Sequence, residues 1–314
     1  MKDFLFFNYS WVANSSYIFK SFENCGYSCD FVTENDLMSF EPTNKYRVVV
    51  VYLHESWMLP KINFLINNFF VDAYVIQHDD TDEEHIQSWL EVAPKLVMQR
   101  ELTKNSILPE QYRDSVVLPH HFPIQSIYDE SLQEKEFDLC FIGTPSNPRR
   151  QKFIDKLVEL SNTTLSHLRW FIRYGSYKDP QEFRYIVNKT KIGLNFPGNS
   201  YDSWRNWEYS SAKVCIIQPK LKVLSVDESH MPFNEYVTIN DDLSNLEETI
   251  LEYLENDKYR IIANDAFNSY NANHTPEKCF EKYCDIVIKA TGLDRLDIIP
   301  LSALTFFDDK TKAI

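Results

Sequence analysis

The chain has 314 residues, of which 32 are basic and 46 acidic, so its formal net charge is −14. Hydrophobic residues make up 44% of it, which suffices for buried cores and excludes an intrinsically disordered chain. No apolar run reaches the ~20 residues of a membrane span, and the six glycines form no phosphate-binding loop of the dinucleotide-enzyme or P-loop type. We expect a protein without a membrane span, located in the cytoplasm or, if viral, in the host cytoplasm.

Short apolar runs alternate with helix-like stretches along the first half. The pattern predicts strands at 3–7, 28–34, 46–53, 73–77, 95–99 and 115–119, and helices at 15–26, at 60–70 and after the acidic run that follows His78. Four consecutive valines at 48–51 favour a strand that is covered on both faces. This alternation predicts a parallel sheet with helices on both sides.

A second series follows the polar residues 119–136, which contain two prolines and are expected to form a linker. It predicts strands at 137–143, 168–175, 191–196 and 213–219, and helices at 147–161, 181–190, 204–212, 246–256, 257–270 and 276–290. We therefore predict an α/β protein of two Rossmann-like domains that face each other across a cleft. Their expected limits are 1–130 and 131–290, with 291–314 as a tail that packs back on the first domain.

The second half resembles the GT-B glycosyltransferases, in particular the CgeB-like proteins and the phage DNA glucosyltransferases. The segments that carry the resemblance are DLCFIGTPSNPRRQKFIDKL, NKTKIGLNFPGNSYDSWRNWEYSSAKVCIIQP, NEYVTINDDLSNLEETILEYLENDKYR and NHTPEKCFEKY, within residues 137–290. The resemblance implies a hexosyl- or pentosyltransferase that moves a sugar from a nucleotide-diphosphate donor to a hydroxyl group.

The resemblance also implies a donor site. Glu208 stands where the family has a glutamate that accepts both hydroxyls of the donor ribose, and Arg205, one helical turn earlier, stands where an arginine contacts the diphosphate. An exposed ion pair between these two residues is the structural alternative. The other candidates for donor binding are Gly143, Arg149, Arg150, Arg173 and Lys213, the last at a position where the family usually has glycine or a small residue.

The strand at 73–77 runs directly into His78 and Asp79. A similar Gln-His-Asp run in a phage enzyme implies that Asp79 is the catalytic base or charge stabiliser and that His78 contacts the sugar or acceptor. Two alternatives are that the acidic residues only favour the start of a following helix, or that Asp80-Thr81-Asp82 is a metal-binding DxD triplet of the GT-A type.

The co-substrate implied is a nucleotide sugar, with a UDP-sugar as the first choice; a divalent metal is possible but not expected to be required. A glycan or small hydroxylated molecule is the expected acceptor. Hydroxymethylated bases of phage-type DNA remain an alternative that the net charge disfavours, and an inactive nucleotide-sugar-binding scaffold is another. Tyr9 and Trp11 could stack on a sugar, whereas His120 and His121 are expected at the surface of the linker.

Overall fold

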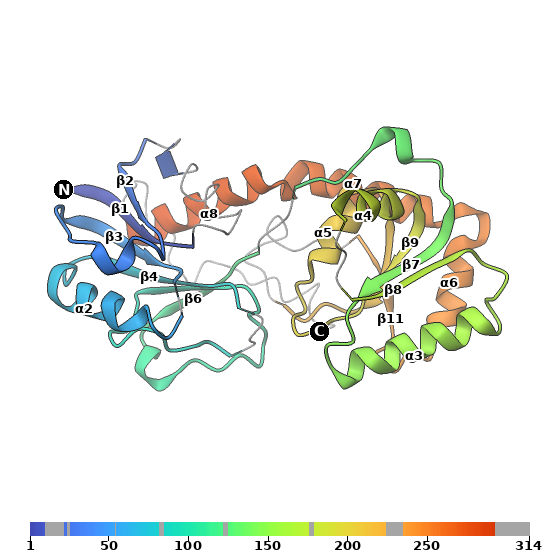
Figure 1. Cartoon of the computed structure of the whole chain (residues 1–314), viewed down its shortest axis with the longest axis horizontal. Helices are drawn as coiled ribbons and strands as arrows, with labels where there is room; N and C mark the ends of the chain where they lie inside the picture. Colours follow the sequence, from blue (N-terminus) through green and yellow to red (C-terminus); the bar gives the residue numbers. More distant parts are fainter. Residues whose placement is uncertain are drawn as a thin grey trace. The chain divides into compact units, whose positions relative to one another are not determined.

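The structure, a computed structural model, describes residues 1–9, 22–23, 26–53, 55–81, 85–121, 125–175, 179–223 and 235–292. It divides into two compact units, each built on one parallel sheet (Figure 1). Among the described residues, the first unit comprises 1–121, Val223 and 276–292, and the second comprises 125–222 and 235–275. The predicted pair of α/β sheets is confirmed.

Six strands form the first sheet, in the order β2-β1-β3-β4-β5-β6. They are β1 (Lys2–Phe7), β2 (Cys29–Val32), β3 (Tyr46–Val51), β4 (Tyr74–Asp79), β5 (Leu96–Gln99) and β6 (Val116–Pro119), and they are accompanied by the 3₁₀ turns η1 (Leu37–Ser39) and η2 (Glu110–Tyr112). Strand β3 shows why both faces must be covered. Val49 and Val51 pack in the cluster that contains helix α2 (Leu59–Phe69), and Val48 and Val50 pack in the cluster that contains α8 (Pro276–Thr291), because neighbouring side chains of a strand point to opposite faces.

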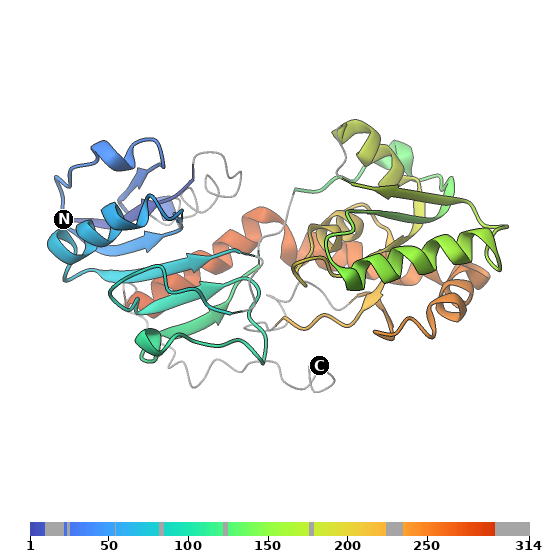
Figure 2. The same cartoon turned by 60° about the horizontal axis from the view of Figure 1, so that its bottom comes forward.

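Helix α8 belongs to the first unit, although the expected domain limits placed 276–290 in the second. The helix, drawn in orange-red, runs along the first sheet (Figure 2). Its side chains Phe280, Tyr283 and Val287 recur at helical spacing and are fully buried with residues of β1, β3 and β5. The first sheet has this apolar face to cover, and α8 covers it together with Phe22. The tail predicted at 291–314 lies outside the described residues, apart from its first two residues.

Five strands form the second sheet, in the order β11-β10-β9-β7-β8. They are β7 (Phe137–Gly143), β8 (Trp170–Tyr174), β9 (Thr190–Leu194), β10 (Cys215–Pro219) and β11 (Val237–Ile239). The helical segments are η3 (Glu130–Leu132), α3 (Pro148–Asn162), α4 (Pro180–Asn188), α5 (Trp204–Ser211), α6 (Leu246–Leu254), η5 (Glu255–Asp257), α7 (Tyr259–Ser269) and the π-helical turn η6 (Tyr270–His274). Helices α3, α6 and α7 contribute to the core on one face, and α4 and α5 to the core on the other.

Two local features differ from the expectation, and the predicted helix at 15–26 lies almost entirely outside the described residues. The short strand β11 was not predicted. No helix forms within residues 85–95. There, the Leu90 amide donates to the Tyr112 hydroxyl (2.8 Å) and the Gln87 carbonyl accepts from the Gln77 side chain (2.7 Å), so side chains bind backbone groups that a helix would pair internally.

The order of strands reverses once in each sheet, between β1 and β3 in the first and between β7 and β9 in the second. In open parallel sheets, ligands bind outside the carboxyl ends of the strands at such a reversal. These two points, called here the first and the second switch point, are where the fold directs the search for function.

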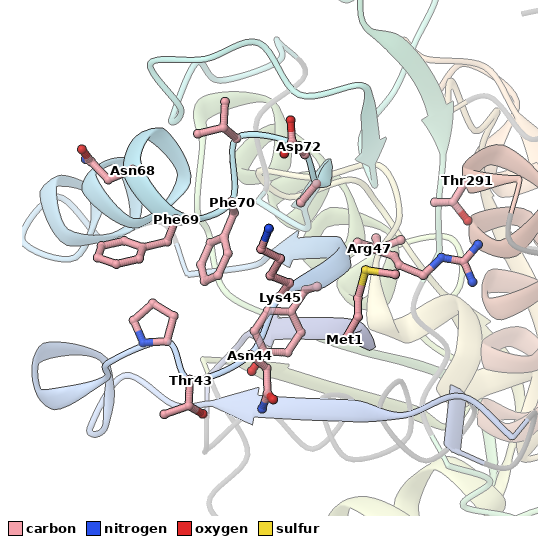
Figure 3. A pocket seen from close by; sticks show the side chains of 15 residues that line it. Met1, Thr43, Asn44, Lys45, Arg47, Asn68, Phe69, Phe70, Asp72 and Thr291 are labelled. Atoms are coloured by element: carbon pink, nitrogen blue, oxygen red, sulfur yellow. The ribbon is translucent and has the colours of Figure 1, made fainter.

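A cavity of about 830 Å³ opens at the other edge of the first sheet (Figure 3). It is lined by residues that precede β3, such as Asn44 and Lys45, and by the turn between α2 and β4, including Asp72. Since strands begin there, this cavity lies at the amino edge, opposite the edge at which folds of this kind bind ligands. Among the described residues no helix is long and apolar enough to span a bilayer.

Candidate functional site

The second switch point is built by the loops that follow β7 and β9. Asn147 caps helix α3: its side-chain oxygen accepts from the Arg150 amide (2.8 Å), and its side-chain nitrogen donates to the Gly198 carbonyl (2.7 Å). One asparagine therefore fixes the start of α3 and ties the two loops together. Proline at the first position of the helix agrees with this geometry.

Arg150 lies between two glycines, one from each loop. A β-carbon added to Gly198 would lie 2.6 Å from the Arg150 Nη1, and one added to Gly143 would lie 3.5 Å from its Cζ. No other residue type would leave the guanidinium this space at position 198. Gly143, one of the predicted donor-binding residues, borders the arginine here.

The charge of Arg150 is buried, and no carboxylate of the described residues neutralises it. The residue is 8% exposed; among the described residues no carboxylate lies within ion-pair distance of it, its Nε has no hydrogen-bond partner, and Nη1 makes one long contact with the Thr144 carbonyl (3.5 Å). Burial lowers the pKa of Arg150, and the positive charge of Arg205 lowers it further. A buried cation that lacks a partner is costly, which suggests that an anion completes the site.

Arg205 and Glu208 lie one turn apart on α5, which Ser203 caps by accepting from the Arg205 amide (3.3 Å). The Arg205 guanidinium donates through Nε to the Ile142 carbonyl (3.0 Å), stacks over the Phe183 ring (4.6 Å to its centre), and pairs with the Glu208 carboxylate. Both side chains are largely buried, so this pair differs from the exposed ion pair of the alternative interpretation. Burial raises the pKa of Glu208, while Arg205 opposes that rise.

Arg149 and Arg173 lie at the same edge but are paired with other residues. Arg149 forms an ion pair with Asp241 (2.9 Å), and its guanidinium lies over the Phe196 ring (5.3 Å). Arg173 lies near Glu182 (3.8 Å) and is about as exposed as Arg149. Their predicted contact with the donor stays a prediction.

Lys213 lies elsewhere, at the C-terminal end of α5 and just before β10 begins, which is the amino edge of the sheet. Its Nζ lies over the Phe267 ring (5.8 Å), and its backbone takes a left-handed conformation with φ of 60°. Glycine adopts this conformation without strain, which agrees with the glycine or small residue that the resemblance leads one to expect at this position. The fold keeps the left-handed turn despite the lysine, and the structure does not bring Lys213 together with Arg150, Arg205 and Glu208.

At the carboxyl edge of the first sheet, His78 is fully buried. Its Nδ1 lies 3.0 Å from the Tyr283 hydroxyl of α8, and its ring packs against Tyr52 and His120 (centres 4.7 and 4.8 Å apart). Burial lowers its pKa to about 3, so the imidazole is neutral at physiological pH. A contact of His78 with a sugar or acceptor stays a prediction, and in this conformation its side chain is not exposed.

Asp79 is also fully buried, and its carboxylate accepts from the amide (3.0 Å) and hydroxyl (2.7 Å) of Thr81. The next residue, Asp80, is half-buried and accepts from the Tyr52 hydroxyl. Two adjacent carboxylates thus have different surroundings, one inside a turn and one at the switch point beside the end of β3.

The histidines expected at the surface of a linker are buried. His120 and His121 directly follow β6, and each is 6% exposed; the boundary between the units falls just after them. Sequence reasoning also missed Asn8, Gln99 and Arg100, which are buried at the ends of β1 and β5. The sequence could have indicated them, since a polar residue lies at or just after the end of almost every strand of this sheet. Trp11 lies outside the described residues, and Tyr9 packs against the Tyr52 ring (5.7 Å).

Among the described residues no group of three His, Cys, Asp or Glu side chains is arranged as metal ligands would be. Asp82, the third residue of the DxD triplet, lies outside the described residues. A metal-binding function of that triplet has no support from Asp80, whose carboxylate binds a tyrosine hydroxyl.

No protein-family model and no curated protein sequence matches the chain, but solved structures do. A glycosyltransferase from Rickettsia africae is similar over 92% of this chain and 98% of its own, with a TM-score of 0.52 and 9% identity. The sucrose-phosphate synthase from Thermosynechococcus elongatus is similar over 94% of this chain and 100% of its own, with a TM-score of 0.51 and 8% identity. A GtfA/B complex matches with a TM-score of 0.51 and 10% identity, and the chain spans 60% of that longer protein. At such identities the likeness is one of fold: the chain has the GT-B fold of two Rossmann-like domains.

Proposed function

We propose that the protein is a glycosyltransferase whose second unit binds a nucleotide-diphosphate sugar at the second switch point. The observation that carries the proposal is Arg150, a buried guanidinium between the loops that follow β7 and β9, with no carboxylate partner in the part of the chain that the structure describes. A diphosphate supplies the missing negative charge and accepts bidentate hydrogen bonds from a guanidinium.

The neighbouring residues extend this role. Arg205 lies close enough to Arg150 to lower its pKa, so the two cations repel each other until an anion is bound between or beside them. Glu208 offers two acceptor oxygens to the vicinal hydroxyls of the donor ribose. Two guanidinium groups also stabilise the charge that develops on the leaving diphosphate, which is why the proposal requires no divalent metal.

The donor to test first is a UDP-sugar, and the proposed acceptor is a glycan or a small hydroxylated molecule bound by the first unit. The net charge of −14 supports this choice over duplex DNA, whose phosphates repel an acidic protein. The polar residues buried at the carboxyl edge of the first sheet are suited to hydroxyl groups rather than to an apolar acceptor.

A thermal-shift screen tests the donor site. UDP-, GDP-, ADP- and CMP-sugars are compared with and without EDTA and Mn²⁺, for the wild type, Arg150→Met, Glu208→Gln and the control Arg113→Met, whose arginine is 71% exposed. A ligand at 100 times its Kd stabilises by about 2.7 kcal/mol. We expect one nucleotide to stabilise the wild type and the control, with EDTA present, and neither site variant.

Stabilisation only with Mn²⁺ would instead support a metal-dependent donor site. No response of the wild type to any nucleotide would contradict the proposal and favour a scaffold that keeps the fold without donor binding.

A further inference from the structure

We propose that the cavity at the amino edge of the first sheet is a carbohydrate site that binds a neutral oligosaccharide, with one sugar ring stacked on Phe69. Its volume of about 830 Å³ is in the range of small-molecule sites. All residues that line it belong to the first unit (Figure 3). None of them belongs to the donor site proposed at the second switch point, so the inference goes beyond the proposed function and does not depend on it.

The floor of the cavity is fixed by packing and by the backbone. Tyr46 and Phe70 line it, are 7% and 3% exposed, and pack edge to face with their ring centres 5.7 Å apart. The Phe70 amide donates to the Leu65 carbonyl (3.2 Å), and the Phe70 carbonyl accepts from the Ala73 amide (3.0 Å). These contacts define the turn between α2 and β4, so the shape of the cavity does not depend on a ligand.

Phe69 supplies an exposed aromatic surface at this cavity. It is the last residue of α2 and is 51% exposed, although burial of such a ring is favourable. The face of an aromatic ring carries partial negative charge, and the C–H groups on one side of a pyranose carry partial positive charge. An exposed ring at the wall of a cavity is therefore a surface on which a sugar ring stacks.

Polar side chains near Phe69 are suited to hydroxyl groups. The Asn68 Nδ2 donates to the Phe64 carbonyl one turn earlier (2.7 Å), which fixes the side chain, and no described group donates to its Oδ1. Lys45 and Asp72 line the same cavity, are exposed, and form no ion pair with a described residue. A sugar hydroxyl both donates and accepts, so it can bind the amide oxygen, the carboxylate or the ammonium group.

The balance of charge favours a neutral ligand. Three side chains of the lining are charged, namely Lys45, Arg47 and Asp72. The Arg47 guanidinium lies 3.6 Å from the Asp3 carboxylate, which offsets its charge. The charges of Lys45 and Asp72 offset each other, which disfavours a phosphate, and an apolar ligand would leave both without hydrogen-bond partners.

Two phenylalanines on one helix provide a matched test. Phe64 and Phe69 are 52% and 51% exposed on α2, but only Phe69 of the two lines the cavity. Maltotetraose, cellotetraose and chitotetraose are titrated into the full chain at up to about 10 mM. Isothermal titration measures affinity, and the NMR signal of the Asn68 side-chain amide reports where the ligand binds.

We expect one of the three oligosaccharides to bind and to shift the Asn68 signal. Phe69→Ala should weaken binding about 10-fold, whereas Phe64→Ala should change it by less than about 2-fold. Asp72→Ala should also weaken it about 10-fold, because a charged acceptor is lost. Asp114→Ala, at a side chain that is 90% exposed and outside the cavity, should leave affinity unchanged.

Arg150→Met separates this site from the donor site, because Arg150 belongs to the second unit. Oligosaccharide affinity should be the same in this variant as in the wild type. Loss of binding in Arg150→Met would overturn the inference, since the oligosaccharide would then occupy the donor site.

Three further outcomes would contradict the inference. They are no binding of any of the oligosaccharides, equal affinities of the two phenylalanine variants, and a shift of the Asn68 signal by adenosine or inorganic phosphate in place of the oligosaccharides. Nucleotide binding in the thermal-shift screen tests the proposed function separately. Failure there together with oligosaccharide binding would overturn the donor site and leave the carbohydrate site standing.

Discussion

The two sheets end in carboxyl edges of opposite character. In the first, His78 and Asp79 are fully buried and engaged by Tyr283 and Thr81. In the second, Arg150 is buried with no carboxylate beside it among the described residues. The fully buried groups of the first edge are paired by its own side chains, whereas at the second edge no described carboxylate neutralises Arg150. In two sheets of similar topology, the buried charges that no side chain neutralises therefore indicate where an ionic ligand binds.

The largest expected effect comes from removing the unneutralised charge. Arg150→Met should weaken nucleotide binding at least 100-fold, or about 3 kcal/mol, and yet raise the melting temperature of the ligand-free protein, because methionine fills similar space without a buried charge. Isothermal titration with UDP and thermal unfolding measure the two effects. A lower melting temperature would show that the charge is neutralised in the free protein and would remove the contrast between the edges.

The buried His78 at the carboxyl edge of the first sheet should make the stability of the protein depend on pH. The pKa of His78 is about 3 in the folded state against an ordinary 6.5, so between these values the unfolded chain binds more protons and stability falls as pH falls. From pH 6.5 to 4.5 this amounts to about 2–3 kcal/mol. The substitution His78→Asn keeps a hydrogen-bond acceptor near the position of Nδ1 for the Tyr283 hydroxyl but has no group that titrates in this range. The stability of α8, measured by hydrogen exchange, should therefore fall less with falling pH in this variant than in the wild type. An unchanged slope would mean that His78 is protonated in the folded protein.

The second unit has its own buried base, in a different pH window. Lys135 donates to the carbonyls of Asn188 and Lys213 at the ends of α4 and α5 (2.8 and 3.5 Å), and burial lowers its pKa to about 8. Stability should therefore rise with pH above about 8, by about 2 kcal/mol up to pH 9.5. Chemical denaturation of wild type and Lys135→Met at pH 8 and 9.5 measures this, and equal slopes in both proteins would refute it.

The smallest expected change in stability comes from Lys213, whose backbone is left-handed. Lys213→Gly should stabilise the second unit by about 0.5–1 kcal/mol, because glycine adopts a φ of 60° without strain. Nucleotide affinity should not change, since Lys213 lies at the amino edge. A loss of affinity on this substitution would place Lys213 back in the donor site.

Much of the fold could be predicted because the patterns are local. The valines of β3, the proline and asparagine at the start of α3, and the apolar face of α8 each specify their element from nearby residues. What α8 packs against could not be predicted, since its apolar face fits either sheet. The absence of helix within 85–95 depends on Tyr112 and Gln77, which are distant in sequence.

The candidate site divides in the same way. Arg205 and Glu208 were expected together because helical spacing places them on one face, and the structure pairs them. Loop geometry and neighbouring strands determine that no described carboxylate pairs with Arg150 and that Tyr52 donates to Asp80. The periodicity of the sequence does not predict the surroundings of Arg150 or of Asp80.

The placement of α8 has a consequence for how the chain folds during synthesis. The second unit is encoded almost without interruption from 125 to 275, whereas the first needs α8, which the ribosome makes only afterwards. Until then, the face of the first sheet that carries Phe4, Phe6 and Val50 lacks the part of its cover that α8 provides. The earliest segment to be translated is thus completed last, and a nascent chain that stalls before residue 276 would present an apolar sheet face to chaperones.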